Sequence, residues 1–290
     1  MKPEIHPTAI IEPGAELADG VVVGAYAYVG GAARLGAGTR LHHHATVIGR
    51  TTMGAGNEVH PGSVLGGVPQ DLKYQGEDTE LIVGDQNTFR ECVTVNIGTE
   101  GGGGKTVLGS QCLLMAYAHI AHDCILGNRV VVANAVQLAG HVRIEDGAVL
   151  SGSAAVHHFS TIGRLSFVGG LSGVRQDVPP FMLVEGNPAR PRGLNLVGLK
   201  RNDVSDESLA ALKKVYRLLY KEDHSRARAI ECIEEDDALM SAPEVRELLD
   251  SFRRSMDGRH GRALEATREN GNGGMYKERK TGRLARQNED

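Results

Sequence analysis

The sequence predicts an all-β fold, a parallel β-helix, followed by a small α-helical C-terminal domain. An apolar residue recurs every six positions through most of residues 5–174, and the spacing of apolar residues becomes helical beyond Pro191. Six is not a multiple of 3.6, so an α-helix would scatter these residues around its axis. We therefore assign residues 1–192 to the β-helix, 193–256 to the helical domain and 257–290 to a disordered tail.

The six-residue period begins near the N-terminus and defines the first strands. Its first run comprises Ile5, Ile11, Leu17, Val23, Val29, Leu35, Leu41, Val47, Met53, Val59 and Leu65. The residue four places after each is usually small or β-branched. Each unit supplies one short strand and a turn, and three units close one triangular coil of about 18 residues. Coils stack ~4.8 Å apart, so each contacts only its neighbours.

Two interruptions break this period, at residues 67–81 ("GVPQDLKYQGEDTE") and 99–106 (within "GTEGGGGKT"). The period resumes in step after the first interruption, and the second shifts it by one residue before an unbroken run from Leu108 to Val174. Both interruptions are therefore predicted to be loops that leave the coils at a corner. Loops on a rigid scaffold commonly carry function.

The C-terminal region carries helical signals. Leu209, Leu212, Tyr216 and Leu219 are spaced for one helix face, with Ser205 as a predicted N-cap. The stretch from Ser241 to Glu244 resembles a capping box. We expect two or three helices over residues 199–256. Residues 257–290 are polar and mixed in charge, which predicts disorder.

Composition excludes several functional classes. The formal net charge of -4 argues against a general nucleic-acid binder. No apolar stretch approaches the ~18 residues of a membrane span, and the N-terminus lacks the apolar core of a signal peptide. The four cysteines have no paired spacing, which predicts reduced thiols in a cytoplasmic protein. They are Cys92, Cys112, Cys124 and Cys232.

Stacking by 18 residues brings histidines together. His122 is placed directly below Gly140, which lies below His158, and Asp123 is placed below His141. The predicted cluster spans three successive coils, within roughly 10–15 Å at the stacking distance. Its members are His119, His122, His141, His157 and His158.

Three interpretations of this cluster are open. Corner histidines can simply be solvated, or imidazoles can bind zinc. Alternatively, His122 is a general base that Asp123 orients, and the Gly140 backbone N–H stabilises a developing oxyanion. Gly140 and Gly170 can also be glycines only because a corner requires positive φ.

Several motifs go beyond the repeat: "QDLKYQGE", "YAHIAHDCILGNR", "LAGHVRIED", "AVHHFSTIG", "GLSGVRQDVPPF" and "GNPARPRGLNLVGLKR". Together they resemble the UDP-N-acetylglucosamine acyltransferases of lipid A biosynthesis, over nearly the whole chain to about residue 256. The resemblance implies a left-handed β-helix and a cytoplasmic homotrimer. It also implies transfer of a 3-hydroxyacyl chain from acyl carrier protein to the 3-hydroxyl of UDP-N-acetylglucosamine. No cofactor is implied beyond the carrier's phosphopantetheine, and no metal.

The resemblance also implies residue roles. His122 is the base, Asp123 holds it, and Gly140 donates to the oxyanion. Phe167 and Gly170 fall at the acyl-chain pocket. Asp71 and Lys73 reach the nucleotide-sugar from the first loop of a neighbouring subunit. The remaining substrate contacts are His119, His141, His157, His158, Asn195 and Arg201.

This sequence departs from the common family pattern at three positions. His158 stands where Gln is common, Val197 where Glu is common, and Asn202 where a second Arg is common. These changes leave open a 3-amino sugar as the acceptor. A zinc-binding protein like the γ-carbonic anhydrases is the other alternative. An acidic carrier protein would require a basic docking patch, for which the candidates are Arg190, Arg192, Lys200 and Arg201.

Overall fold

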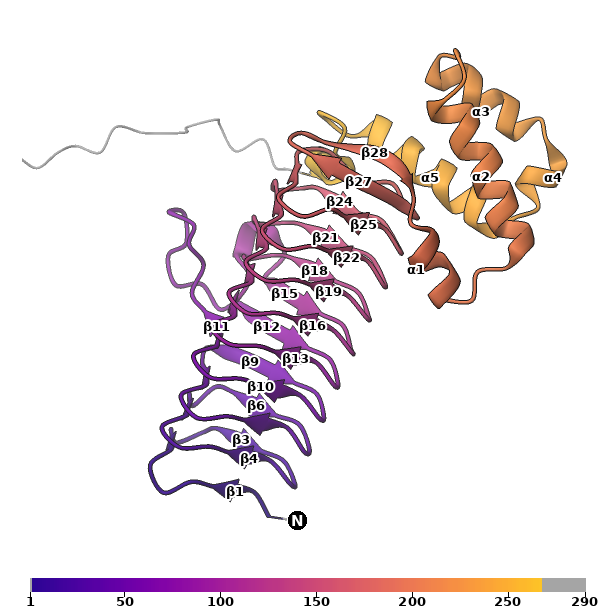
Figure 1. The fold of residues 1–290 in the computed structure, drawn as a ribbon. Helices are drawn as coiled ribbons and strands as arrows, with labels where there is room; N and C mark the ends of the chain where they lie inside the picture. Colours follow the sequence, from indigo (N-terminus) through magenta and orange to yellow (C-terminus); the bar gives the residue numbers. More distant parts are fainter. Residues whose placement is uncertain (1, 268–290) are drawn as a thin grey trace, which may run out of the picture.

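A computed structural model describes residues 2–267 and shows a left-handed parallel β-helix with a helical unit at its C-terminal end (Figure 1). Three parallel sheets form the three faces of the prism, which we call A, B and C. From β1 to β26, consecutive strands lie on successive faces, so each face receives every third strand. The predicted fold class is confirmed.

The strands of each face follow in stacking order. Face A contains β1 (Glu4–Ile5), β4 (Val22–Val23), β7 (Arg40–Leu41), β10 (Glu58–Val59), β13 (Thr88–Phe89), β16 (Leu113–Leu114), β19 (Val131–Val132), β22 (Val149–Leu150), β25 (Phe167–Val168), β27 (Met182–Gly186) and β28 (Ala189–Leu194). Face B contains β2 (Ile10–Ile11), β5 (Tyr28–Val29), β8 (Thr46–Val47), β11 (Val64–Gly67), β14 (Thr94–Asn96), β17 (His119–Ile120), β20 (Gln137–Leu138), β23 (Ala155–Val156) and β26 (Gly173–Val174). Face C contains β3 (Glu16–Leu17), β6 (Arg34–Leu35), β9 (Arg50–Met53), β12 (Glu80–Val83), β15 (Lys105–Leu108), β18 (Ile125–Leu126), β21 (Arg143–Ile144) and β24 (Thr161–Ile162).

The periodic apolar residues form the core of the prism. Val59 pairs with Phe89 in the next coil, and both side chains are fully buried. The small residues four places on, such as Ala27 and Ala45, are buried at the corners. Ile5 stays 45% exposed because the first coil has no coil beneath it. The six-residue period therefore identifies the residues that fill the core, except in the first coil.

The corners impose an unusual backbone conformation on non-glycine residues. Asp123, His141, Phe159 and Leu171 all have φ between 58° and 62°. Such left-handed conformations persist only where the surrounding structure enforces them. Gly140 is absent from the positive-φ residues, since the next residue, His141, occupies that position. The alternative interpretation, that Gly140 and Gly170 are glycines because the corner requires positive φ, is therefore wrong.

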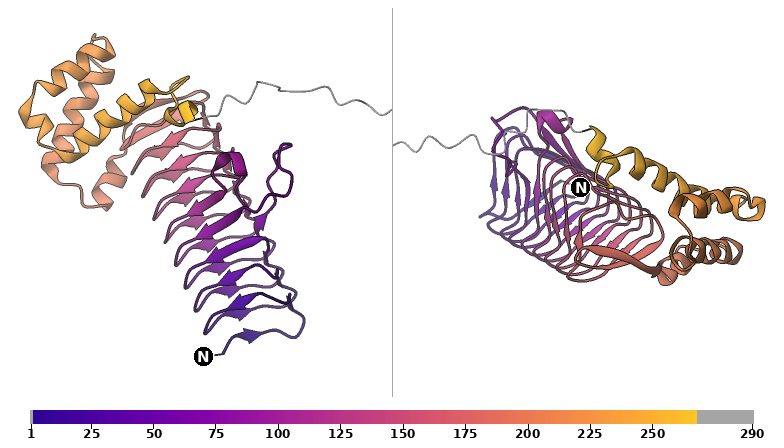
Figure 2. Two further views of the ribbon diagram at one scale, coloured as in Figure 1. Left: turned by 180° about the vertical axis from the view of Figure 1, so that it is seen from behind. Right: turned by 90° about the horizontal axis from the view of Figure 1, so that it is seen from above.

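Both interruptions are loops that leave the same edge of the prism. The first joins β11 to β12 and the second joins β14 to β15, so each leaves where face B passes into face C. We call this the B–C edge. The second loop contains the short 3-10 helix η1 (Glu100–Gly102). Figures 1 and 2 show both loops on the side away from the helical unit.

Face A continues beyond the predicted boundary at residue 192, because β27 and β28 form an antiparallel hairpin that ends at Leu194. Five α-helices follow within the described chain, more than the two or three expected. They are α1 (Leu196–Arg201), α2 (Asp206–Tyr220), α3 (Arg226–Glu234), α4 (Asp237–Met240) and α5 (Pro243–Asp257). The sequence reading missed α1 and α4 because a helix of one turn or little more shows no period.

Of the two predicted helix N-caps, the one at Ser205 is confirmed and the one at Ser241 is wrong. The Ser205 side chain accepts a hydrogen bond from the Ser208 N–H at 3.1 Å and caps α2 as expected. Ser241 instead ends α4, and its hydroxyl donates to the Ala238 carbonyl. The residue before α5 is Ala242, and Pro243 begins the helix. Proline suits a first helical position because no N–H is needed there.

Residues 257–267 are ordered, which contradicts the expected start of disorder at residue 257. Arg262 is only 8% exposed, and its guanidinium donates to the Glu265 carboxylate at 2.7 Å. It also donates to the Arg175 carbonyl, and the Ala263 N–H donates to Asp177. A segment rich in charged residues has the composition of a disordered segment even when those residues form ion pairs within the fold. The prediction from composition is therefore wrong for residues 257–267. Residues 268–290 of the predicted tail lie outside the described residues.

Truncation of the core side chain at Phe89 should destabilise the β-helix. Phe89→Ala is expected to cost about 3–5 kcal/mol of unfolding free energy, because the cavity cannot be filled between two fixed coils. Met256→Ala, at a 67% exposed residue of α5, should change it by less than about 0.5 kcal/mol. Urea titration monitored by circular dichroism measures both. Equal midpoints for the two variants would contradict the assigned core.

Candidate active site

A histidine–aspartate pair lies at the B–C edge, between β17 and β18. His122 Nδ1 is 2.6 Å from Asp123 Oδ2. The Asp123 side chain is fully buried, while 13% of the His122 side chain is exposed. An ionised carboxylate only accepts hydrogen bonds, so Nδ1 must carry the proton. Nε2 of His122 is then an acceptor facing away from Asp123, as a general base requires.

The second loop holds the Asp123 carboxylate in place. The Thr99 backbone N–H donates to Oδ1 at 2.7 Å, and the Thr99 hydroxyl donates to Oδ2 at 2.6 Å. Burial alone would raise the pKa of Asp123, but the hydrogen bonds from His122 and Thr99 outweigh it. The pKa of this carboxyl is therefore lowered. Sequence reasoning missed Thr99, since only the break at 99–106 marked this loop.

The loop approaches Asp123 so closely that Gly102 has no room for a side chain. A Cβ at Gly102 would lie 2.0–2.3 Å from the three carboxyl atoms of Asp123. At the neighbouring Gly101 a Cβ would meet nothing within 4 Å. Neither glycine has positive φ, so the difference is steric. The glycine run thus lets one loop close over the buried carboxylate.

Gly140 lies one coil above His122, as the 18-residue stacking predicts. A Cβ at Gly140 would lie 2.5 Å from Cε1 and 2.7 Å from Nε2 of the His122 ring. The glycine is therefore required by the imidazole packed against it. No described residue accepts a hydrogen bond from the Gly140 N–H. This donor and the Nε2 acceptor can serve one bound group.

Two more histidines surround the pair. His141 is edge-on to His122, with ring centroids 5.1 Å apart, and stacks on Phe159 at 4.4 Å. Burial lowers the pKa of His141, although the Asp123 carboxylate opposes this effect. His119 Nδ1 is 2.8 Å from the Thr94 hydroxyl, and burial lowers its pKa as well. Both rings are therefore neutral hydrogen-bonding groups at neutral pH.

The upper end of the cluster is a histidine pair. The rings of His157 and His158 lie 3.8 Å apart, tilted by 38°. His157 Nδ1 is 3.1 Å from the His158 carbonyl oxygen, so this nitrogen is its donor. His158 also contacts Phe159 edge-on at 5.5 Å. Through Phe159 and His141, the cluster is continuous from His158 down to His122.

The first loop reaches the same cluster. Asp71 Oδ2 is 3.0 Å from Lys73 Nζ, and the Lys73 N–H donates to Asp71 Oδ1. Burial acts to raise the pKa of Asp71, but Lys73 and then His122 lower it on balance. The loop thus comes within electrostatic range of His122 in its own chain.

Four of the predicted site residues lie on the other edges. Asn195 and Arg201 flank and end α1, beside the edge where face C passes into face A. The Asn195 amide donates to the Leu165 carbonyl and accepts from the Gly198 N–H, which gives it a structural role as helix cap. Phe167 lies in β25 on face A, and Gly170 follows that strand where face A passes into face B. One chain therefore does not join these four residues to His122.

Two of the three residues that depart from the family pattern, Val197 and Asn202, lie in or at the end of α1. Asn202 ends α1, and its amide donates to the Gly198 carbonyl at 2.9 Å. Val197 is 60% exposed on the same helix. The four candidate docking cations are exposed on β28 and α1. They are Arg190, Arg192, Lys200 and Arg201.

His122, Asp123 and His141 could in principle hold a metal, since their ligand atoms lie within 4.8 Å of one another. Asp123 Oδ2, however, already accepts from His122 and Thr99, and Oδ1 accepts from Thr99. A cation would have to displace these donors from a fully buried carboxylate. The donor set fits acid–base chemistry better than metal binding.

The neighbouring Cys124 is not a nucleophile. Burial raises the pKa of its thiol to about 12, so the thiolate is not populated near neutral pH. All four cysteines are free thiols. Among residues 2–267, no helix is long and apolar enough to cross a membrane.

Comparison with known proteins adds independent findings. Residues 177–261 match the family described as UDP-N-acetylglucosamine O-acyltransferase, domain 2, and residues 105–140 match the bacterial transferase hexapeptide repeats. An acyl-[acyl-carrier-protein]–UDP-N-acetylglucosamine O-acyltransferase of Anaeromyxobacter is 50% identical over 79% of this chain and 90% of its own length. The same enzyme of Agrobacterium fabrum is 43% identical over 85% of this chain and 91% of its own. The structure of UDP-N-acetylglucosamine O-acyltransferase from Moraxella catarrhalis superimposes with a TM-score of 0.79 at 39% identity, over 85% and 95% of the two chains.

Gly102→Ala should disturb the Asp123 carboxylate, whereas Gly101→Ala should not. The added methyl group pushes the carboxylate away from the Thr99 donors, so the Asp123 pKa should rise from its lowered value. Carboxyl ¹³C titration of selectively labelled protein, assigned with Asp123→Asn, measures this shift. Gly101→Ala is the matched control, since its methyl group meets nothing. Identical titrations in the two variants would refute the proposed closure of the loop over Asp123.

Proposed function

The chain belongs to the acyl-[acyl-carrier-protein]–UDP-N-acetylglucosamine O-acyltransferase family, and from this membership we infer its reaction. It transfers a 3-hydroxyacyl chain from acyl carrier protein to the 3-hydroxyl of UDP-N-acetylglucosamine, the first step of lipid A biosynthesis. The observation that supports the residue roles most directly is His122 packed between the buried Asp123 and the bare backbone of Gly140.

We propose that His122 is the general base. Nε2 takes the proton of the sugar's 3-hydroxyl as its oxygen attacks the thioester carbonyl. Asp123 keeps the proton on Nδ1 and stabilises the imidazolium that forms. The C–O bond forms, the C–S bond breaks, and His122 returns the proton to the leaving thiolate of phosphopantetheine. The step balances without any further cofactor.

The Gly140 N–H is proposed to stabilise the oxyanion. It has no acceptor among the described residues and lies beside the His122 ring. A thioester carbonyl bound there would stand next to the attacking hydroxyl. Fixed backbone donors of this kind need no reorganisation as charge develops.

The remaining polar residues of the B–C edge are proposed to bind the substrate. His119 and His141 are neutral donors or acceptors beside the base, and His157 and His158 extend the row upward. Asp71 and Lys73 close over the cluster from the first loop and are proposed to contact the nucleotide-sugar. Lys73 is paired with Asp71 but 86% exposed, so its ammonium group is accessible to an anionic group of the substrate.

We propose that the enzyme is a homotrimer, because the predicted site residues lie on all three edges. Asn195, Arg201, Phe167 and Gly170 can join His122 only where two copies meet. Face A offers an apolar row for such a contact, each member half-buried and stacked on the next. The row comprises Leu113, Val131, Val149, Phe167 and Leu183. Apolar surface of this extent is typical of an interface.

The acyl group is delivered on acyl carrier protein. We propose that the exposed cations of β28 and α1 form the surface on which this protein docks. Arg192 and Lys200 are not held in ion pairs among the described residues. We propose the cytoplasm as the location, since the chain's free cysteines suit a reducing compartment.

Replacement of the base should abolish most of the turnover. His122→Ala is expected to lower kcat about 10²–10⁴-fold, the usual contribution of a general base, with little change in the KM for the sugar. Acyl transfer is assayed with purified enzyme, 3-hydroxyacyl carrier protein and UDP-N-acetylglucosamine. His44→Ala, on a different edge, is the control and should retain full activity. A wild-type rate for His122→Ala would overturn the assignment.

Acyl-chain choice tests the proposed pocket at Gly170. A Cβ at Gly170 would meet the Gly152 carbonyl oxygen at 3.4 Å, an ordinary contact distance, so the coil has room for the Cβ of a Gly170→Leu variant. The added side chain should shift the preference toward shorter chains by at least about tenfold, as loss of roughly 1.4 kcal/mol predicts. A panel of 3-hydroxyacyl carrier proteins of increasing length measures this. An unchanged length preference would exclude Gly170 from the pocket.

The same panel decides between oxygen and nitrogen acceptors. We expect transfer to UDP-N-acetylglucosamine and little to its 3-amino analogue. Transfer to the amine alone would retain the fold and the base but change the product. His158, Val197 and Asn202 would then be the residues to exchange.

A further inference from the structure

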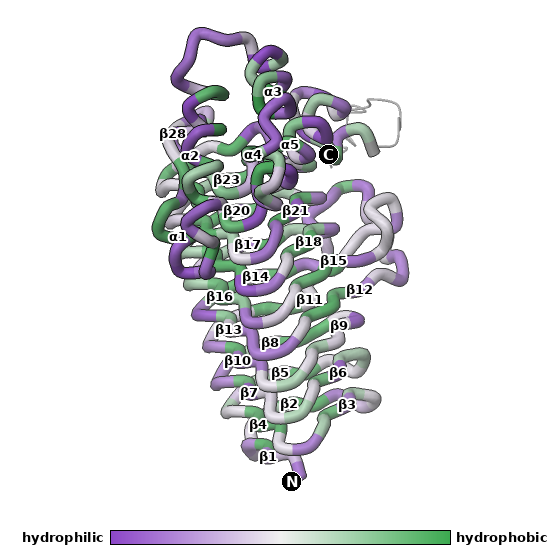
Figure 3. Tube along the Cα trace, turned by 90° about the vertical axis from the view of Figure 1, so that its right-hand side faces the viewer, coloured by the Kyte–Doolittle hydropathy of each residue, from purple (hydrophilic) through white to green (hydrophobic). Residues whose placement is uncertain are grey.

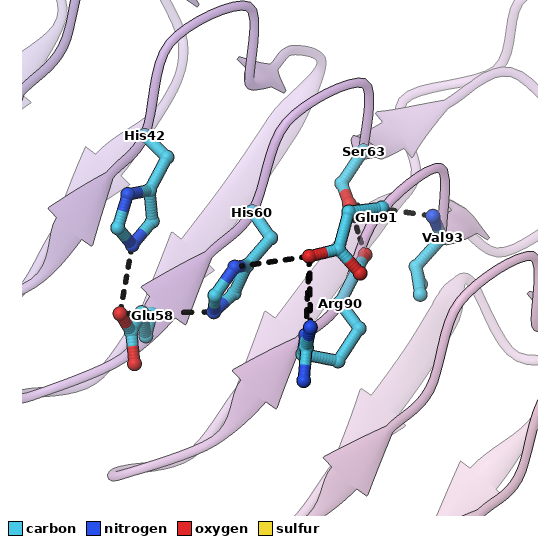
Figure 4. Close-up of polar contacts among 7 residues, drawn as sticks. All are labelled: His42, Glu58, His60, Ser63, Arg90, Glu91 and Val93. Atoms are coloured by element: carbon cyan, nitrogen blue, oxygen red, sulfur yellow. Dashed lines mark hydrogen bonds and ion pairs between the residues drawn. The ribbon is translucent and has the colours of Figure 1, made fainter.

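A second group of histidines with a carboxylate lies low on the β-helix, far from His122. His42 follows β7 and His60 follows β10, both where face A passes into face B. Glu58 is the first residue of β10 and points outward between them (Figure 4). The acyl-transfer reaction uses none of these residues.

Both imidazoles direct the same nitrogen toward one carboxylate oxygen. His42 Nε2 is 2.7 Å from Glu58 Oε1, and His60 Nε2 is 3.6 Å from the same atom. The two rings stack with centroids 4.5 Å apart. The three ligand atoms all lie within 4.8 Å of one another. Two nitrogens and one carboxylate oxygen therefore lie close enough together to become ligands of one ion after small side-chain movements.

The outer nitrogen of His60 faces a second carboxylate. Its Nδ1 is 3.5 Å from Glu91 Oε1, and Arg90 holds the same carboxylate at 2.9 Å (Figure 4). Metal-bound histidines characteristically donate their other ring N–H to a carboxylate, which fixes the tautomer and the ring orientation. His60 thus has the surroundings of a ligand that presents Nε2.

We propose that His42, Glu58 and His60 bind a divalent transition-metal ion of the zinc type. Zinc bonds to imidazole nitrogen and carboxylate oxygen at about 2.0–2.2 Å, which places tetrahedral ligand atoms about 3.4 Å apart. The His60–Glu58 distance of 3.6 Å already matches. The His42–Glu58 pair has to open by about 0.7 Å, a small change for two side chains that are 32% and 42% exposed.

The charge state of the group suits a cation. The hydrogen bond with His42 lowers the pKa of Glu58, so the carboxylate is ionised at neutral pH. Burial, with a further contribution from His42, lowers the pKa of His60, so its ring is neutral there. Stacked imidazoles can both stay neutral as ligands of one ion, whereas two protonated rings would repel each other.

The expected role is structural. His42 and His60 stand in adjacent coils, since β7 pairs directly with β10. A bound ion would join the two coils at their outer edge, near the open N-terminal end of the prism. It would raise stability through binding to the folded state alone. It would leave acyl transfer unchanged, because His42 and His60 lie in lower coils than His122, Phe167 and Gly170.

Cobalt(II) is the probe, because its visible spectrum distinguishes tetrahedral nitrogen and oxygen ligation from loose surface binding. Untagged full-length protein is stripped with chelator, titrated with Co²⁺ and, in parallel, dialysed against Zn²⁺ for metal analysis. We expect one ion per chain. Zn²⁺ at about 100 times its Kd should raise the thermal midpoint by about 5–10 °C.

The variants locate the ion. His42→Ala and His60→Ala should each lose the Co²⁺ spectrum, the bound zinc and the thermal shift, while acyl-transfer activity is kept. His44→Ala, a stacked histidine of the same edge, should keep all of them. His122→Ala removes the other group of possible ligands and should still bind one ion. Stoichiometric metal that survives His42→Ala and His60→Ala, or no stoichiometric metal in the unmodified chain, overturns the proposal.

Discussion

The parallel hydrogen-bonded ladder between coils is the constraint on which the rest of the molecule depends. Each strand pairs with the strand one coil away in a fixed register, as in the pairing of His119 with Gln137. A slip by one residue would turn every inward apolar side chain outward, so the buried core enforces the register. The vertical neighbours of each corner residue are thereby fixed, and the site inherits its geometry from this stacking.

The B–C edge combines that rigid stacking with two adjustable loops. The coils set His122 below Gly140 and force Asp123 into a left-handed conformation at its corner. The coils alone leave the Asp123 carboxylate without its Thr99 donors. The loop that breaks the repeat supplies these donors, and Gly102 lets it close. Figure 3 shows face B, where β17 and β20 lead into this edge, with the projecting loops beside face C. The fold positions the base, and the interruption fixes the protonation of its partner.

The β-helix and the pairing of His122 with Gly140 could be predicted from the sequence because both follow from the six-residue period. Apolar spacing gave the coil, and addition of 18 residues placed His122 under Gly140. It failed where contacts are not periodic. Thr99 holds Asp123 across a loop, Asn195 caps a helix, and Arg262 pairs within a segment that looks disordered by composition. Each failure involves a polar side chain whose partner is distant in sequence or set by a short element. Such partners leave no periodic pattern in the sequence, so they become visible only in the folded structure.

The two histidine–carboxylate groups of this chain show how burial separates acid–base chemistry from metal binding. Asp123 is fully buried, and its two oxygens already accept hydrogen bonds from Thr99 and His122. The carboxylate therefore serves to orient the His122 imidazole. Glu58 is 42% exposed and receives a single hydrogen bond, from His42. The second imidazole, that of His60, lies 3.6 Å from the same carboxylate oxygen. A buried carboxylate with saturated oxygens gains nothing from a cation that must break those bonds. An accessible carboxylate between two imidazoles gives up only its hydrogen bond with His42, and that imidazole becomes a ligand of the same ion, so the same residue types favour different chemistry at the two edges.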